Sequence, residues 1–143
     1  HLAGRRFELM GEKNGVKIIH DYAHHPAEIM ACLQAAKRYP HKKLWVVFQC
    51  NSYTRAKTLK NKYATSFGEA DMVLVPDIFP GRDIDRGEIH ARDLVASIAS
   101  HTPCTYIPTF EEISVYLDEH ASPGDIVITL GSGSVGVETR KLL

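Results

Sequence analysis

The nine residues HDYAHHPAE, from His20 to Glu28, gather three histidines, two acids, a tyrosine and a proline directly after the apolar run VKII. An aspartate can hold hydroxyl groups, a tyrosine ring can stack on a flat ligand, and an imidazole can contact an anion. These are the groups that a nucleotide requires of a protein. The same residues could also form a metal site, an acid and base pair, or a solvated polar loop.

A zinc or iron site here would use His20 and His24, which are four residues apart. Residues that precede a proline disfavour helical geometry, so with Pro26 following, the two imidazoles are not expected to share a helical face. The cysteines are odd in number and widely spaced: Cys32, Cys50 and Cys104. This spacing favours buried, unreactive thiols over a disulfide framework or a metal knuckle.

For the segment from His20 to Glu28, a nucleotide site and a polar loop therefore remain open.

Two arginines also follow expected strands. Arg55 ends the segment QCNSYTR, and Arg82 lies in DIFPGRD. A guanidinium group can pair through two parallel hydrogen bonds with a carboxylate or a phosphate. Each arginine could equally be solvated.

The segment GSGSVG contains Gly131, Gly133 and Gly136 at the spacing of the dinucleotide-binding fingerprint. That fingerprint also needs a second strand and an acidic residue about 20 positions later to hold the ribose. Only seven residues follow Gly136. The segment is therefore interpreted as a tight turn between a strand and a helix.

The elements that must position these residues alternate along the chain. Asn14 and Gly15 predict the turn of a hairpin, and apolar residues spaced three and four apart predict a helix from Pro26. The expected strands cover residues 5–12, 15–19, 43–49, 71–77, 104–108 and 123–130. The expected helices cover residues 26–38, 55–70, 91–100 and 110–120, and residues 131–143 turn into a last helix. Thr109 with Glu112 forms a capping box at the fourth helix.

This alternation predicts an α/β fold: a Rossmann-like, mostly parallel sheet with helices on both faces, preceded by an N-terminal β-hairpin. In such sheets ligands bind beyond the carboxyl ends of the strands. The polar segments described above all follow strands, so we expect them at that edge.

Composition narrows the classes of function. The chain of 143 residues is 44% apolar, enough for a single domain over residues 1–143 with a real core. Seventeen basic residues balance seventeen acidic ones, which argues against nucleic acid or an anionic membrane as a partner. The longest apolar runs are far below the roughly 20 residues of a membrane span. We expect a soluble, cytoplasmic protein.

The segments GRRFELMGE, DYAHHPAEI, VVFQ with SYTR, ADMVLVPDI and PGDIVITLGSGSV follow one another as they do in the C-terminal domain of the Mur ligases, which this chain resembles. The resemblance covers nearly the whole chain, and DYAHHP is its most specific motif. It implies that the chain is about the last third of a three-domain enzyme. The phosphate loop of the family's central ATPase domain is absent from these residues.

The reaction implied by the resemblance is amide formation in peptidoglycan precursor synthesis. ATP phosphorylates the carboxylate of UDP-N-acetylmuramate, and the amino group of L-alanine attacks the acyl phosphate, releasing phosphate. The central domain would bind most of ATP and its Mg²⁺, and this domain would pack against it on closure, which excludes water. No catalytic residue is expected within this domain alone, and the isolated domain is expected to be inactive.

Carried over residue by residue, the resemblance implies two sets of contacts. The nucleotide contacts are Arg6, Asp21, Tyr22 and His24. The substrate contacts are Arg55, matched to an arginine for the carboxylate of alanine, with Asn51 and Arg82.

The chain departs from the family pattern at two places. His20 stands where an aspartate is common, and Cys50-Asn51-Ser52 replaces a proline, a histidine and an arginine or threonine. The missing histidine leaves the accepted amino acid open. The alternatives are a murein peptide ligase, which joins a tripeptide to the same sugar, and a stand-alone nucleotide-binding module without catalysis.

Overall fold

The computed structural model describes residues 6–143. Arg5, the first residue of the first expected strand, lies outside this range. In chain order the elements are β1 (Glu8–Lys13), β2 (Val16–Asp21), α1 (Pro26–Lys37), β3 (Leu44–Phe48), α2 (Tyr53–Tyr63), β4 (Met72–Val75), α3 (Ala91–Ala99), β5 (Cys104–Tyr106), α4 (Phe110–His120), β6 (Ile126–Leu130), α5 (Val135–Glu138) and the 3-10 helix η2 (Thr139–Leu142).

The strands form one six-stranded sheet in the order β1-β2-β6-β3-β4-β5. β1 and β2 form an antiparallel hairpin, and the other neighbouring strands are parallel. The hairpin turns at Asn14 and Gly15, whose φ values of 53° and 81° are the left-handed conformation that this pair tolerates. The predicted fold class is confirmed.

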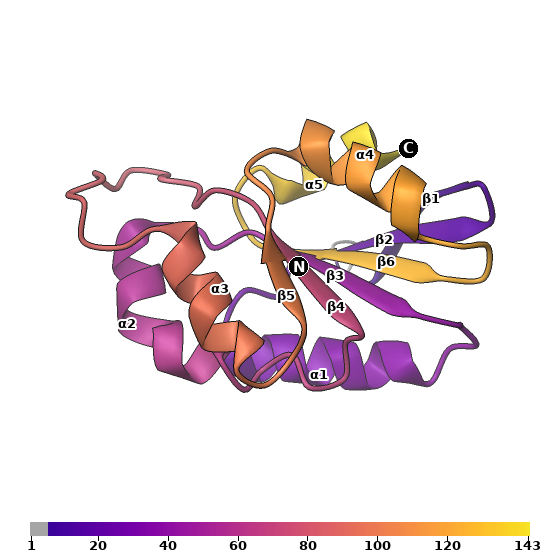
Figure 1. The fold of residues 1–143 in the computed structure, drawn as a ribbon, viewed down its shortest axis with the longest axis horizontal. Coiled ribbons are helices and arrows are strands. Elements are labelled where there is room, and N and C mark those ends of the chain that lie inside the picture. The colour runs from indigo at the N-terminus through magenta and orange to yellow at the C-terminus, as the bar shows by residue number, and fades with distance from the viewer. Residues whose placement is uncertain (1–5) are drawn as a thin grey trace.

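Helices cover both faces of the sheet (Figure 1). Alternate residues of a strand point to opposite faces. Val46 and Phe48 of β3 pack in the core beneath α1, α2 and α3. Trp45 and Val47 pack on the other face with α4 and the C-terminal segment. Because both faces are covered, every residue of β3 is buried, which explains the unbroken apolar sequence LWVVF.

The helix predicted over residues 55–70 begins earlier and is shorter, because α2 ends at Tyr63. The N–H of Ser66 bonds to the carbonyl oxygen of Tyr63, three residues back, and its hydroxyl donates to the oxygen of Lys62 at 2.7 Å. Such tightened turns and side-chain bonds to the main chain compete with regular helix.

The last helix predicted within residues 131–143 is present as the short α5 followed by η2. The hydroxyl of Thr139 donates to the carbonyl oxygen of Val135 at 2.6 Å and lies 2.7 Å from the hydroxyl of Thr129 on β6. Nδ1 of the buried His20 lies 3.0 Å from the same Thr129 hydroxyl. A buried polar network with the sheet therefore shapes this segment more than helical propensity does.

The three thiols are buried or partly buried. Burial raises the pKa of Cys50 and of Cys104 to about 12. Burial, together with the nearby carboxylate of Asp21, also raises the pKa of Cys32. Because these pKa values are raised, few of the three thiols are ionised at neutral pH, in accord with the prediction of unreactive cysteines.

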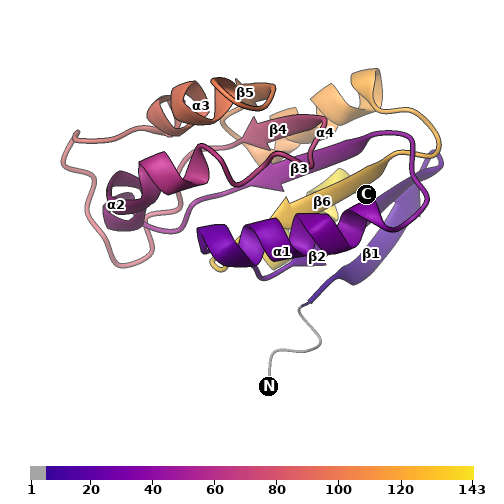
Figure 2. The same cartoon turned by 90° about the horizontal axis from the view of Figure 1, so that it is seen from below.

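β6 is the last strand in sequence, yet it lies between β2 and β3. From β2 and β3 the chain continues into α1 and α2 on one face, whereas from β6 it continues into α5 on the other. Neighbouring strands whose exits diverge create a switch point, where open α/β sheets bind ligands. In Figure 2 the arrowheads of β3, β4 and β6 point toward this shared edge.

Candidate functional site

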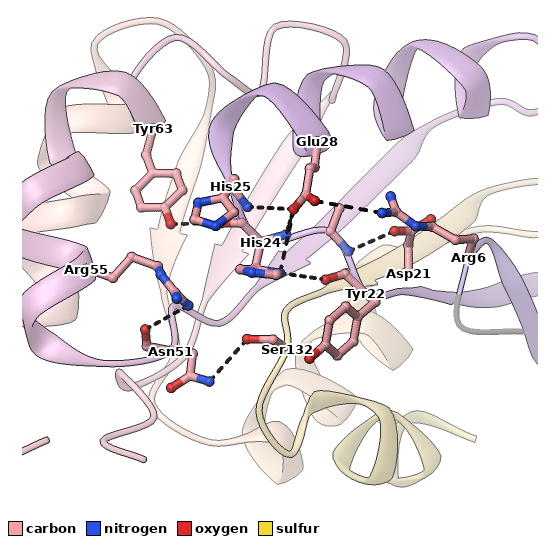
Figure 3. A network of polar contacts seen from close by, with 11 residues as sticks. Arg6, Asp21, Tyr22, His24, His25, Glu28, Asn51, Arg55, Tyr63 and Ser132 are labelled. Carbon is pink, nitrogen blue, oxygen red and sulfur yellow. Dashed lines mark hydrogen bonds and ion pairs between the residues drawn. The ribbon is translucent and has the colours of Figure 1, made fainter. Parts of the chain in front are cut away.

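Three loops meet at the carboxyl edge of the sheet. Asp21 of β2 and Phe48 of β3 both pair with Leu130 of β6, so these three strands end level with one another. The structure thereby brings together the loops that follow them (Figure 3): residues 22–25, 49–52 and 131–134.

Asp21 ends β2 and is only 3% exposed. One carboxylate oxygen accepts the N–H of Phe7 at 2.9 Å, and the other accepts the N–H of Ala23 at 2.8 Å. These bonds tie the start of the described chain to the loop after β2. A carboxylate offers about four lone-pair sites, so acceptor capacity remains.

Glu28 organises the start of α1. One of its oxygens accepts the N–H groups of His24 and His25 at 3.3 and 3.1 Å, and the other lies 3.7 Å from a guanidinium nitrogen of Arg6. Partial burial acts to raise the pKa of Glu28, but the two backbone hydrogen bonds and the nearby imidazoles hold it below its ordinary value. Glu28 was not among the site residues predicted from the sequence, although an acidic residue three positions after His25, with Pro26 between, is a capping signal.

Tyr22 and His24 lie beside each other. Nδ1 of His24 lies 3.0 Å from the carbonyl oxygen of Tyr22, and the two rings meet edge to face at 5.4 Å between centroids. The hydroxyl of Tyr63 on α2 donates to the carbonyl oxygen of His24 at 2.8 Å. No sequence signal pointed to this contribution of Tyr63, because it depends on how α2 packs.

Tyr22 also lines a cavity of about 230 Å³ next to the glycine turn. Its other walls include Ser132, Gly133 and Arg140. A Cβ on Gly133 would lie 2.5 Å from the Phe79 ring. Gly131, with φ of 147°, has similarly little room, since a Cβ there would lie 2.8 Å from the carbonyl oxygen of Gln49. The lack of space for a side chain therefore explains why glycine stands at both positions of the turn that was predicted here.

Arg55 and Asn51 come together on the opposite side of the edge. Nη1 of Arg55 donates to the carbonyl oxygen of Asn51 at 3.4 Å, and the side-chain amide of Asn51 donates to the hydroxyl of Ser132 at 3.1 Å. Asn51 thus joins the loop after β3 to the loop after β6.

Arg82 lies apart from these contacts. It is exposed, and among residues 6–143 no hydrogen bond or ion pair holds its side chain. Its neighbour Asp83 accepts hydrogen bonds from the N–H and the hydroxyl of Thr54 at 2.7 and 2.8 Å, which fastens the loop to the start of α2. These bonds hold the pKa of Asp83 below its ordinary value. A cavity of about 420 Å³ lies between α2 and residues 83–89.

Within the described residues, no three side chains of histidine, cysteine, aspartate or glutamate are grouped as they would be around a metal ion. His20 and His24 make separate contacts, with Thr129 and with the loop backbone. No helix of residues 6–143 has the length and apolar character needed to cross a membrane.

The fold and its polar edge define an α/β domain with a switch point, the place where open α/β sheets generally bind ligands. Residues 5–133 match the family described as "Mur ligase, glutamate ligase domain". The chain belongs to this family and is a Mur ligase C-terminal domain, which confirms the resemblance found in the sequence.

Two curated relatives are similar over nearly the whole chain. A UDP-N-acetylmuramate–L-alanine ligase from Alkaliphilus metalliredigens is 50% identical over 139 residues, which are 97% of this chain and 30% of the relative. A ligase of the same name from Acetivibrio thermocellus is 46% identical over 132 residues, 92% of this chain and 28% of the relative. The chain therefore spans less than a third of the length of these relatives.

Solved structures share the fold. A UDP-N-acetylmuramate–alanine ligase from Thermotoga maritima superposes with a TM-score of 0.74 at 22% identity, and a murein peptide ligase from Psychrobacter arcticus with 0.77 at 24%. A MurF ligase from Thermotoga maritima, solved in complex with ADP, superposes with 0.58 at 21%. Each match covers 96% of this chain and 29% of the other. At these identities the likeness establishes the fold.

Proposed function

We propose that residues 1–143 are the C-terminal domain of a three-domain, ATP-dependent ligase that joins L-alanine to UDP-N-acetylmuramate in the cytoplasm. The observation that carries this proposal is the meeting of the DYAHHP loop, the loop that leads to Arg55 and the glycine turn at one edge. Relatives with this name at 50% and 46% identity support it.

In this proposal Arg6, Asp21, Tyr22 and His24 contact the nucleotide. The lone pairs left on Asp21 would accept ribose hydroxyls, and Tyr22 would present its ring beside the cavity that it lines. The side chain of Arg6 is 47% exposed, and its ion pair with Glu28 is long at 3.7 Å, so donors remain for an anion.

On the substrate side Arg55 would pair with the carboxylate of the amino acid, with Asn51 beside it and Arg82 on the adjoining loop. A guanidinium group suits this role because its two parallel donors match a carboxylate. The described residues offer no grouped metal ligands. As the resemblance to the Mur ligases implies, Mg²⁺ and the phosphates of ATP are assigned mainly to the central domain.

Closure of this domain on the central domain would complete the site. The γ-phosphoryl group of ATP would pass to the muramoyl carboxylate, the amine of L-alanine would attack the acyl carbon, and phosphate would leave as the amide forms. The contribution of this domain is to hold two substrates in position and to exclude water, which would otherwise hydrolyse the acyl phosphate. No catalytic residue is assigned to the domain itself.

The test is phosphate release by the full-length protein supplied with ATP, Mg²⁺ and UDP-N-acetylmuramate. We expect release with L-alanine, and none from the isolated domain under the same conditions. Phosphate release with the tripeptide but not with L-alanine would favour a murein peptide ligase, the other activity left open by Asn51 and Ser52. Nucleotide binding without release for any acceptor would favour a stand-alone binding module.

A further inference from the structure

Ser52, which directly precedes α2, has an unusual backbone conformation, with φ of 85° and ψ of 144°. This region is comfortable for glycine and strained for a residue that carries a Cβ. The other non-glycine residues with positive φ among residues 6–143 are Phe7 and Asn14. Asn14 lies in the hairpin turn, where asparagine tolerates such values, whereas Ser52 lies beside the proposed substrate contacts.

Two backbone hydrogen bonds hold Ser52 in this conformation. Its N–H donates to the carbonyl oxygen of Phe79 at 2.7 Å, and the N–H of Phe79 donates to the carbonyl oxygen of Cys50 at 2.9 Å. The Phe79 ring in turn packs against Gly133, where even a Cβ would not fit. The loops after β3, β4 and β6 are thereby locked into one junction.

Asn51 closes this junction and reaches Arg55 (Figure 3). Its side chain donates to Ser132, and its carbonyl oxygen accepts Nη1 of Arg55. A Cβ on Gly81 would lie 3.1 Å from the side-chain oxygen of Asn51, so the loop after β4 also approaches it closely.

Ser52 then sets the start of α2. Its hydroxyl accepts the N–H of Arg55 at 3.1 Å, so it caps the helix at the residue whose guanidinium contacts Asn51. Arg55 is thus held at its main chain by Ser52 and at its side chain by Asn51. Any relaxation at Ser52 would change the direction in which Arg55 leaves the first turn.

We propose that Ser52 is a positioning residue: its strained backbone, held by the three-loop junction, aims Arg55 at the carboxylate of the amino acid. This inference rests on the proposed function, because it takes Arg55 to bind that carboxylate. Ser52 itself need not touch the substrate.

The test is Ser52→Gly in the full-length ligase. Glycine tolerates the observed φ, but it lacks the capping hydroxyl and can also adopt many other backbone conformations, so the start of α2 is no longer fixed. A misplaced binding group loses much of its effect, and we expect the KM for the amino acid to rise about tenfold. The KM for ATP should stay within about twofold, because the nucleotide contacts lie on another loop. The Tm should be unchanged or higher, since relief of strain opposes the small loss of the cap.

Two further variants separate the causes. Asn14→Gly changes another residue of positive φ, far from the junction, and should leave both KM values unchanged. Ser52→Ala keeps the Cβ and the junction but removes the capping oxygen. We expect it to lower the Tm and to raise the KM for the amino acid by less than about threefold.

An unchanged KM for the amino acid in Ser52→Gly would overturn the inference. Equal increases in both KM values, or an increase also found in Asn14→Gly, would overturn it as well, because they would indicate general loosening. Arg55→Ala in the same assay separates failure of the inference about Ser52 from failure of the proposed role of Arg55. If that variant leaves the KM for the amino acid unchanged, the role of Arg55 in the proposed function fails, independently of the result at Ser52.

Discussion

The two sides of the carboxyl edge differ in how their charged groups are held. On the Asp21 side, the carboxylates of Asp21 and Glu28 accept four backbone N–H groups at 2.8 to 3.3 Å. On the Arg55 side, the guanidinium of Arg55 makes one hydrogen bond, of 3.4 Å, and that of Arg82 makes none with a described residue. The first side is organised by the chain's own backbone. On the second side, neither guanidinium forms an ion pair with a carboxylate of residues 6–143, which is the condition in which a guanidinium can pair with the carboxylate of a ligand. The difference predicts that mutations on the first side change stability as well as nucleotide binding, whereas mutations on the second side change substrate binding with little effect on stability.

The largest effect is expected for Asp21→Ala. The substitution leaves the N–H groups of Phe7 and Ala23 without acceptors, and each such loss costs about 1 to 3 kcal/mol. We expect the free energy of unfolding, measured by urea denaturation, to fall by about 2 to 4 kcal/mol. Asp118→Ala removes an exposed carboxylate paired with Lys13 and should change it by less than about 1 kcal/mol. Equal losses of unfolding free energy in the two variants would contradict a structural role for Asp21.

Asp21→Asn retains an acceptor oxygen and is the better variant for kinetics. A charge-assisted bond to the ribose is worth about 1 to 1.5 kcal/mol more than the neutral bond that asparagine can still accept, so kcat/KM for ATP should fall about fivefold to tenfold in the full-length enzyme. An unchanged kcat/KM for ATP in the folded variant would mean that Asp21 only holds the loop and does not bind the nucleotide.

On the opposite side, Arg55→Lys should raise the KM for the amino acid, because lysine keeps the charge but lacks the two parallel donors. Arg55→Ala should cost about another 1 to 2 kcal/mol in binding, because the substrate carboxylate is left unpaired. Steady-state kinetics for both substrates, with a thermal melt of each variant, provide the measurement. Equal effects on the KM values for ATP and for the amino acid would contradict the assignment.

A smaller effect is expected for Glu28→Gln. An acidic residue at a helix N-terminus contributes about 0.3 to 1 kcal/mol. Because the pKa of Glu28 is lowered in the folded state, this contribution is present above the ordinary pKa of 4.5 and is lost as the pH falls through the folded-state value. The difference in unfolding free energy between wild type and variant should therefore be larger at pH 7 than at pH 3. An equal difference at both pH values would argue against this ionised contact.

The smallest effect is expected for Arg82→Ala. Its side chain is exposed and unpaired among the described residues, so the unfolding free energy should change by less than about 0.5 kcal/mol. The KM for the amino acid should rise less than in Arg55→Ala. An increase as large as that of Arg55→Ala would show that Arg82 contributes as much as Arg55 to binding of the substrate carboxylate.

Local patterns in the sequence predicted much of this molecule. Asn14 and Gly15 defined the hairpin turn, and the apolar runs defined buried strands. Thr109 caps α4 as expected, although the carboxylate of Glu112 accepts the Thr109 hydroxyl at 2.9 Å, and the reciprocal bond to a backbone N–H is not formed. These features depend on residues a few positions apart, whose conformational preferences act within one turn or strand.

Other features were decided by contacts between residues far apart in the chain. The short α5 follows from the side-chain bond between Thr139 and Thr129 on β6, whereas α2 ends early through a local bond from Ser66 to Lys62. The insertion of β6 between β2 and β3 places the DYAHHP loop beside the glycine turn. No periodicity predicts this strand order, because pairing between distant strands depends on how both faces of the sheet are packed.

The sequence by itself determined the types of groups at the site and the strand ends that carry them, because turn chemistry and hydrophobic period are local properties. Only the tertiary structure decided that Asn51 would join Ser132, that Tyr63 would hold the loop of His24, and that Ser52 would be forced to a φ of 85°. A strained backbone persists only where the surrounding structure enforces it, and that enforcement comes from three loops separated in sequence.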